Sequence, residues 1–132
     1  MKTIIVMAIA AVGVVSAPLA QADRVEQTNA ASSPEGNWSR GDGKAKVRIA
    51  PCGDDLCAVN TWIKTGVKDE KVGDKLVMTV SHSGGGQWSG KAYDPQRKLT
   101  YRLKMTVAAD TMKTSGCVLG GLICKGVTWS RI

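Results

Sequence analysis

From residue 36 onward, apolar and polar side chains alternate in short runs. In residues 45–49 apolar side chains take every second position between basic ones, and residues 99–105 repeat this pattern. Successive side chains of a strand point to opposite faces, so a period of two predicts antiparallel strands with one buried and one solvated face. The other runs of this character are residues 56–63, 75–81, 87–93, 111–117 and 124–131.

Turn-forming residues separate these runs, and no window of about 11 residues or more has helical periodicity. About seven or eight strands at this spacing predict an all-β fold, a small antiparallel up-and-down β-barrel. A β-sandwich of the same strands is the alternative. The turn signals are Gly53-Asp54-Asp55, Gly73-Asp74, Gly84-Gly85-Gly86, Asp94-Pro95 and Gly120-Gly121.

The start of the chain has the pattern of an export signal. Lys2 precedes an unbroken apolar run from Ile4 to Val15, and Ala22 ends a small-residue cleavage site. A membrane-spanning helix needs about 18 or more apolar residues, and Ser16 interrupts this run first. We therefore expect a signal peptide over residues 1–22 and a mature chain without a transmembrane segment.

Residues 23–35 contain one large apolar side chain, Val25, which is too little to form a core. This composition predicts a flexible linker before a single β-barrel domain over residues 36–132. A domain of this size buries a modest share of its unfolded surface, so covalent cross-links matter to its stability.

The four cysteines form two close pairs, Cys52 with Cys57 and Cys117 with Cys124. They could ligate zinc or form disulfides. Tight zinc sites usually have about two to four residues between ligands, and an oxidising compartment favours disulfides. Each pair brackets a turn between predicted strands, where opposed Cβ atoms lie about 4.5–5.5 Å apart. We therefore predict two local disulfides and no metal site.

The chain is basic, with 18 Lys and Arg residues against 11 Asp and Glu residues and a net charge of +7. Exported basic proteins meet anionic lipid, polysaccharide and acidic proteins far more often than nucleic acid. We expect a periplasmic or secreted monomer that does not bind nucleic acid.

Several landmark residues follow one another in a fixed order. They are Gly36-Asn37-Trp38, Pro51-Cys52-Gly53 with Leu56-Cys57, the segment from Trp88 to Pro95 with Tyr101 after it, Gly116-Cys117, and Cys124-Lys125 with the segment from Thr128 to Arg131. In this combination the chain resembles the exported bacterial domain-of-unknown-function family 2147 over residues 36–132. The resemblance implies a small exported β-barrel and little about chemistry, because the family's activity is not established.

The chain also has a looser similarity to lipocalin-like barrels, which begin with Gly-x-Trp and end with an Arg laid across that Trp. The matching residues here are Gly36, Trp38 and Arg131. Strand alternation independently places Arg131 on the same face as Trp129, and a guanidinium stacked on an indole is worth about 0.5–2 kcal/mol. We predict that Arg131 closes one end of the barrel by stacking on Trp38; the alternative is a solvated Arg131.

The sequence gives little sign of catalysis. His82 is the only histidine, and its neighbours Ser81 and Ser83 would point to the opposite face of a strand. A hairpin tip that contains a histidine explains this segment better. The triple glycine at 84–86 lacks the Lys-Ser/Thr of a phosphate loop. We therefore expect a protein that is not an enzyme and has no cofactor.

Two features indicate binding. The loop over residues 118–123 is apolar where a hairpin tip is normally polar, and we expect it to fold over the barrel mouth as a plug; exposure as a contact surface is the alternative. The chain has no Phe, and its many small inward side chains leave room for a small ligand in an eight-stranded barrel, although a narrower barrel would fill itself.

These features predict non-catalytic binding of a small apolar or amphipathic ligand in the cell envelope. The alternative is a protein-interaction module, such as an inhibitor of an envelope hydrolase, that uses the tip at residues 83–87 or 118–123. An open apolar interior favours the first function, and a filled interior with a protruding loop favours the second. The candidate lining residues are Trp38, Trp62, Trp88, Tyr101 and Trp129.

Overall fold

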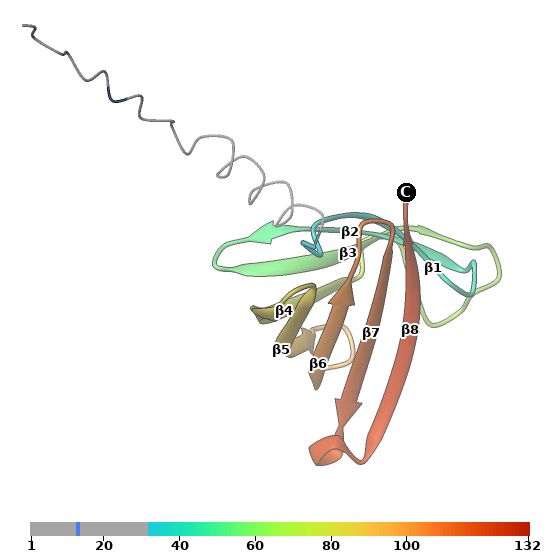
Figure 1. The fold of residues 1–132 in the computed structure, drawn as a ribbon. Helices are drawn as coiled ribbons and strands as arrows, with labels where there is room; N and C mark the ends of the chain where they lie inside the picture. Colours follow the sequence, from blue (N-terminus) through green and yellow to red (C-terminus); the bar gives the residue numbers. More distant parts are fainter. Residues whose placement is uncertain (1–12, 14–31) are drawn as a thin grey trace, which may run out of the picture.

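Eight antiparallel strands follow one another in sequence, and the last pairs with the first to close a barrel (Figure 1). The computed structural model describes Gly13 and residues 32–132. The predicted signal peptide, apart from Gly13, and most of the predicted linker lie outside the described residues. The strands are β1 (Gly36–Arg40), β2 (Ala45–Cys52), β3 (Asp55–Ile63), β4 (Lys75–Gly84), β5 (Gln87–Asp94), β6 (Leu99–Val107), β7 (Thr111–Val118) and β8 (Ile123–Arg131).

The barrel confirms the period-two pattern and excludes the sandwich. In β2 the side chains of Ala45, Val47 and Ile49 are buried, whereas those of Lys46 and Arg48 are exposed. Burial of apolar side chains is the main stabilising contribution in such a fold. The core cluster consists of Trp38, Val47, Ile49, Met78, Ala92, Leu103, Met105, Val107 and Met112.

The two ends of the barrel are built differently. One end collects the start of β1, the β2–β3, β4–β5 and β6–β7 turns, and the end of β8. We call it the closed end, because Trp38 and Arg131 fill it. The opposite end, which we call the open end, carries the β1–β2, β3–β4, β5–β6 and β7–β8 connections, and a cavity leads to it.

The last residues of the predicted linker belong to the closed end. Pro34 is fully buried, and its carbonyl oxygen accepts a hydrogen bond of 2.9 Å from Trp38 Nε1. The carbonyl oxygen of Ser32 accepts one of 2.9 Å from Trp88 Nε1. Residues 32–35 therefore cover the closed end. The sequence pattern missed this because these contacts are made by two backbone carbonyls and a single proline ring.

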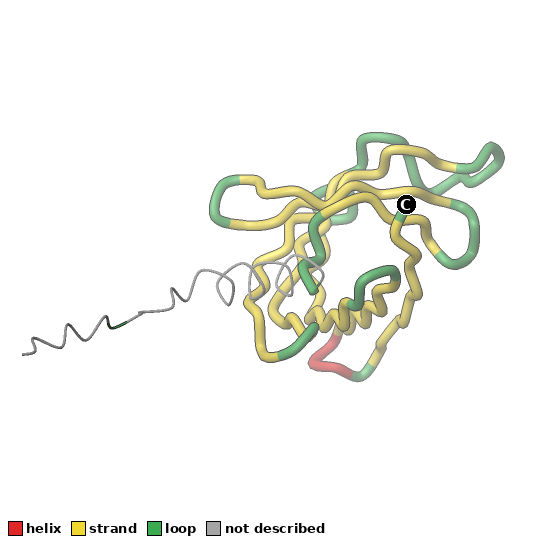
Figure 2. The backbone as a smooth tube through the Cα atoms, turned by 45° about the horizontal axis from the view of Figure 1, so that its top comes forward, coloured by secondary structure: helices red, strands yellow, loops and turns green. Residues whose placement is uncertain are grey.

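The ladder that joins the first and last strands and closes the barrel has few residue pairs. β1 pairs with β8 only through Trp38–Arg131, Ser39–Ser130 and Arg40–Trp129. The first half of β8 pairs with β7 alone among the described strands. β7 pairs with β6 as far as Cys117, so only the first half of β8 forms an edge of the sheet among the described strands. We call the β7–β8 hairpin the ribbon, and its tip is the lowest part of the molecule in Figure 1. Figure 2 shows the strands running around the ring, with the short 3-10 turn Leu119–Gly121 at the tip of this hairpin.

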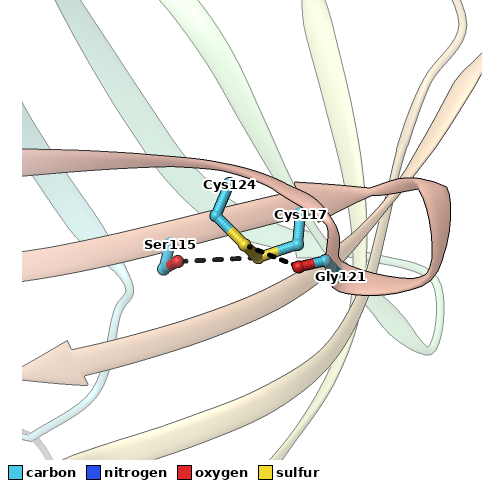
Figure 3. The surroundings of a disulfide bond; sticks show 4 residues. All are labelled: Ser115, Cys117, Gly121 and Cys124. Atoms are coloured by element: carbon cyan, nitrogen blue, oxygen red, sulfur yellow. Dashed lines mark hydrogen bonds between the residues drawn. A yellow bond between two sulfur atoms is a disulfide. The ribbon is translucent and has the colours of Figure 1, made fainter.

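Two disulfides staple the barrel, as predicted. The Cys52–Cys57 bond joins β2 to β3 at the closed end, and the Cys117–Cys124 bond joins β7 to β8 near the tip of the ribbon (Figure 3). The Cys124 sulfur lies 3.5 Å from the carbonyl oxygen of Gly121. A disulfide sulfur has no proton to donate, so this approach is a packing contact. Among the described residues there is no helix of the length and apolar character needed to span a bilayer.

Candidate functional site

A cavity of about 260 Å³ lies inside the barrel and reaches the open end. Small-molecule sites usually measure about 300–1,000 Å³, so this space suits a small ligand. The core side chains that form its apolar part come from β2, β3, β4, β6, β7 and β8. They are Val47, Ile49, Ala58, Leu76, Met78, Leu103, Met105, Met112 and Trp129.

Methionines form much of the apolar wall. Met78, Met105 and Met112 are buried and line the cavity from three strands. A methionine side chain is unbranched and flexible, so it can repack around ligands of different shape. The wall can therefore adapt to the apolar part of a bound molecule.

Two aromatic side chains bring polar atoms to this wall. Trp129 donates a hydrogen bond of 3.0 Å from Nε1 to Thr114 Oγ1, so its indole N–H is already satisfied. The half-buried Tyr101 lines both the cavity and the polar hollow outside it, and its hydroxyl makes no hydrogen bond to another described residue. The Tyr101 hydroxyl is thus available to a ligand as donor or acceptor.

An arginine at the end of β1 clamps the open end. Arg40 donates two parallel hydrogen bonds to Glu70, of 2.5 Å from Nη1 to Oε1 and 2.7 Å from Nη2 to Oε2, and a third to Asp42. Its hydrogen bonds lower the pKa of Glu70, against an opposing effect of burial. Because Glu70 lies in the β3–β4 loop, this ion pair ties that loop to β1 across the mouth of the cavity.

A second charged pair closes the β5–β6 turn. Asp94 is buried, and its Oδ2 accepts a hydrogen bond of 2.9 Å from Arg97 Nη1. Its Oδ1 also accepts bonds from the backbone N–H groups of Gln96 and Arg97. Burial raises the pKa of Asp94, but the hydrogen bonds from Arg97 and Gln96 outweigh burial and hold that pKa below its usual range. The Asp94-Pro95 turn signal is confirmed, and the turn also positions Arg97 beside the cavity.

The entrance contains cations besides the two arginines that form these ion pairs. A polar hollow next to the cavity is lined by five cations and three carboxylates, with Val67 and Tyr101 between them. The cations are Arg40, Lys44, Lys68, Arg97 and Lys125, and the carboxylates are Asp42, Asp69 and Glu70. None of these three lysines forms a salt bridge with another described residue. The entrance can therefore attract the anionic or polar group of an amphipathic ligand.

The predicted stacking of Arg131 on Trp38 is confirmed at the closed end. The guanidinium carbon lies 4.2 Å from the centre of the indole ring. Arg131 also donates hydrogen bonds to the carbonyl oxygens of Ala109, Glu35 and Ser33. A Cβ atom on Gly36 would lie 2.7 Å from Arg131 Nη1, and Gly36 has a φ of +131°, so glycine is required there.

The five candidate lining residues separate into two groups. Tyr101 and Trp129 line the cavity, whereas Trp38, Trp62 and Trp88 do not. Trp38 and Trp88 point inward but lie at the closed end, under Pro34 and Ser32. Strand alternation predicts which face a side chain occupies, not its depth along the barrel axis, which explains these two corrections.

Trp62 lies on the outside of the barrel. The ladder between β2 and β3 shifts register between Lys46 and Val47, so Trp62 pairs with the outward-facing Lys46. The Lys46 ammonium nitrogen lies 5.3 Å from the centre of the Trp62 ring, which is 42% exposed. One extra residue in a strand reverses the face of those after it, and this bulge corrects the prediction for Trp62.

The two candidate tips also differ from each other. His82 lies in the β4–β5 hairpin, contacts the Gly85 carbonyl oxygen and packs against the Trp88 ring at 5.1 Å between centroids, as a hairpin histidine would. The apolar loop at residues 118–123 does not plug the mouth: Leu119 is 69% exposed and Leu122 is 86% exposed. The plug prediction is wrong, because the ribbon carries this loop beyond the barrel wall.

Sequence reasoning did not identify the charged mouth. Arg40 and Glu70 are far apart in the chain, and neither stands in a recognisable motif. The available signal was a basic residue, Arg40, shortly after the Gly36-Asn37-Trp38 landmark, and a basic residue there is compatible with many surface positions. Among the described residues, no three or more His, Cys, Asp or Glu side chains group in a way that could hold a metal ion.

A family model described as "Uncharacterized protein conserved in bacteria (DUF2147)" matches residues 36–131. The match covers the whole barrel from β1 to β8. No curated protein and no solved structure matches the chain.

Proposed function

The chain belongs to the DUF2147 family of uncharacterised bacterial proteins, and we propose that it binds a small amphipathic molecule inside the barrel without chemically changing it. The observation that carries this proposal is an apolar cavity of about 260 Å³ that leads to a charged mouth. Both parts of such a ligand would find a matching environment within one barrel.

The apolar part of the ligand would lie among Met78, Met105 and Met112, where removal from water contributes about 25 cal/mol for each Å² buried. Its polar part would reach the Tyr101 hydroxyl and the cations of the entrance. Arg40 and Arg97 already have carboxylate partners, and Lys44, Lys68 and Lys125 outnumber the remaining carboxylate of the hollow, Asp69. This arrangement favours an anionic head group over a cationic one.

We place this activity in the cell envelope. The predicted signal peptide and the two disulfides support an oxidising compartment outside the cytoplasm. The closed up-and-down barrel also fits the looser similarity to lipocalin-like carriers.

Filling the cavity tests the proposal. Ala58 of β3 lines the cavity, and the adjacent Val59 does not. The parent protein and the Val59→Phe control should gain thermal stability with rising concentration of fatty acids or an apolar fluorescent probe, as mass action requires. The Ala58→Phe variant should fold and show no such gain. The proposal fails if no amphipathic compound stabilises the parent, or if Ala58→Phe responds as the parent does.

The exposed loop at residues 118–123 is the observation that favours the alternative, a protein-interaction module such as an inhibitor of an envelope hydrolase. This alternative predicts that the parent protein takes up no probe. It also predicts that replacing Leu122 by a charged residue abolishes binding to a protein partner. The open cavity favours ligand binding over this alternative.

A further inference from the structure

The tip of the β7–β8 ribbon exposes a cluster of aliphatic side chains that no part of the described chain covers. Leu119 is 69% exposed, Leu122 is 86% exposed and Ile123 is 57% exposed. Contiguous exposed apolar groups on an otherwise polar protein mark a contact surface. We call these three residues the apolar tip.

The backbone of the tip is held in an unusual conformation. Leu119 has a φ of 54°, in the left-handed region that bulky side chains rarely adopt. Gly or Asn would fit this position with less strain, so a leucine here is unexplained by the turn itself. Such outliers persist where the surrounding structure holds them, and they cluster at functional sites. The Cys117–Cys124 disulfide lies directly behind the tip and fixes the two strands that carry it (Figure 3).

A basic wall runs along the outside of the barrel from the apolar tip. Lys91 and Arg102 line a hollow together with Leu119, whereas Lys104 and Lys113 lie farther from the tip. The exposed residues Lys91, Arg102, Lys104 and Lys113 lie on β5, β6 and β7, on the outer face of the barrel. Lys91 and Arg102 are direct partners in the ladder, an arrangement that disfavours folding because like charges face each other. None of the four forms a salt bridge with another described residue. The outward positions of these three strands carry no carboxylate.

Charge is also distributed unevenly along the barrel axis. The acidic groups Glu35, Asp54, Asp55 and Asp110 lie at the closed end, where Arg131 is the nearby cation. The loops of the open end add further lysines around the mouth. They are Lys44, Lys64, Lys68, Lys71 and Lys98. With Arg40 and Arg97 they make seven cations, against the five carboxylates of this end, Asp42, Asp69, Glu70, Asp74 and Asp94, so the described open end is net positive and the closed end is net negative. An anionic surface would therefore attract the open end and repel the closed end.

We propose that the protein docks on an anionic lipid bilayer, with the apolar tip inserted among the lipids and the basic-wall residues nearest to it, Lys91 and Arg102, against their head groups. A bilayer matches both features at once, since it offers an apolar layer directly beneath a layer of negative charge. A protein partner fits less well, because a stable interface usually buries about 800 Å² on each side around an apolar core, and three side chains at a hairpin tip do not supply one.

This orientation brings the open end of the barrel to the membrane. The β7–β8 ribbon and the cavity mouth belong to the same end, so a docked barrel would face the bilayer with Tyr101 and the entrance lysines. The docking inference rests on the tip and the charge distribution alone. It stands or falls independently of ligand uptake by the cavity.

Co-flotation of the disulfide-bonded protein with lipid vesicles tests the inference. The protein should bind vesicles of phosphatidylcholine mixed with phosphatidylglycerol, bind vesicles of phosphatidylcholine alone weakly, and dissociate as salt is raised. Each cation that approaches the anionic surface should strengthen partitioning about fivefold. Equal binding to both vesicle types, or no binding to either, would overturn the proposal.

Matched variants assign the binding to the tip and the wall. Leu122→Ser should weaken partitioning about tenfold by removing one inserted side chain, whereas Ile132→Ser, at an apolar residue that is 61% exposed at the closed end, should leave it unchanged. Arg102→Gln should cost about fivefold, and Arg48→Gln on the opposite wall should cost less. Residues 1–31 are the same in every variant, so a loss of binding in Leu122→Ser and Arg102→Gln excludes binding through those residues alone. If Leu122→Ser binds vesicles as the parent does and instead loses a protein partner, the tip is a protein interface and the proposal is wrong.

Discussion

An arginine lies at each end of this barrel, but one end is sealed and the other is open to a cavity. At the closed end Arg131 stacks on a fully buried Trp38 and donates to three backbone carbonyls. At the open end Arg40 pairs with Glu70 and Asp42, and a cavity lies beneath it. An arginine that is packed on an aromatic ring seals the barrel, whereas one that is paired only with carboxylates leaves it accessible.

The difference lies in what surrounds each guanidinium. Carbonyl acceptors at the closed end come from residues 33–35 and from the β6–β7 turn, so the contacts of Arg131 join both ends of the domain sequence. The partners of Arg40 are side chains on two loops, and such chains lose more conformational freedom when they are ordered. We therefore expect the stability of the fold to depend mainly on the closed end.

The largest effect should come from removing the closed-end indole. Trp38→Ala deletes a fully buried aromatic side chain and should lower the free energy of unfolding by about 3–5 kcal/mol. Trp62→Ala, the same substitution at a tryptophan that is 42% exposed, should cost about 1 kcal/mol or less. Denaturant unfolding of the two variants measures the difference directly.

A double-mutant cycle sharpens this result. Arg131→Ala should destabilise the fold on its own, and the double variant with Trp38→Ala should lose less than the sum, with a coupling of about 0.5–2 kcal/mol. Strict additivity would show that the stacked pair contributes no interaction of its own. The buried indole and the hydrogen bonds of Arg131 to backbone carbonyls would then contribute independently to the free energy of unfolding.

Removing the closed-end disulfide should lower the free energy of unfolding more than removing the disulfide near the open end. Both losses should lie between those of Trp38→Ala and of the open-end substitutions. Their sequence separations are 5 and 7, so constraining the unfolded chain is worth about 2 kcal/mol in each case. Cys57 is buried, whereas Cys124 is exposed. Replacing Cys52 and Cys57 by Ser should therefore cost more, because it also buries a hydroxyl. Replacing Cys117 and Cys124 should increase amide hydrogen exchange chiefly in the β7–β8 ribbon.

Equal losses of stability from the two double replacements, with hydrogen exchange raised throughout the barrel in both, would contradict this division between the ends. The parent protein provides the reference state. Alkylation under denaturing, non-reducing conditions should modify none of its four cysteines.

The fold was predictable because its information is local. Alternation in β2 and β6 specifies an inward face, and glycine and Asp-Pro turns mark the boundaries. The site was only partly predictable because it depends on distant pairings. The bulge that turns Trp62 outward, the depth of Trp38 and Trp88, and the Arg40–Glu70 clamp all follow from how strands register around the closed barrel. The apolar tip was visible in the sequence, but its exposure depends on how far β8 extends past its short pairing with β1.

The smallest effect on stability should come from the open-end clamp. Glu70→Gln removes a salt bridge whose partners are 16% and 25% exposed, and solvent screening limits the expected loss to about 1 kcal/mol. Asp69→Asn, at the neighbouring carboxylate without a salt bridge among the described residues, is the matched control and should change less. Because the clamp faces the cavity mouth, Glu70→Gln should alter the affinity for an apolar probe more than it alters the melting temperature.

The contribution of the Arg40–Glu70 ion pair to stability should depend on pH. Arg40 holds the pKa of Glu70 below its usual value of about 4.3, so the clamp stabilises the fold above that pH. This contribution is lost as the pH falls through the lowered pKa of the folded state, where the carboxylate becomes protonated. The stability difference between the parent and Glu70→Gln should therefore be constant near neutral pH and vanish in stronger acid. The Asp94–Arg97 pair weakens in the same range, but it is present in both proteins and cancels in the comparison. A difference that persists unchanged in strong acid would show that Glu70 acts through packing and that the mouth is not held by charge.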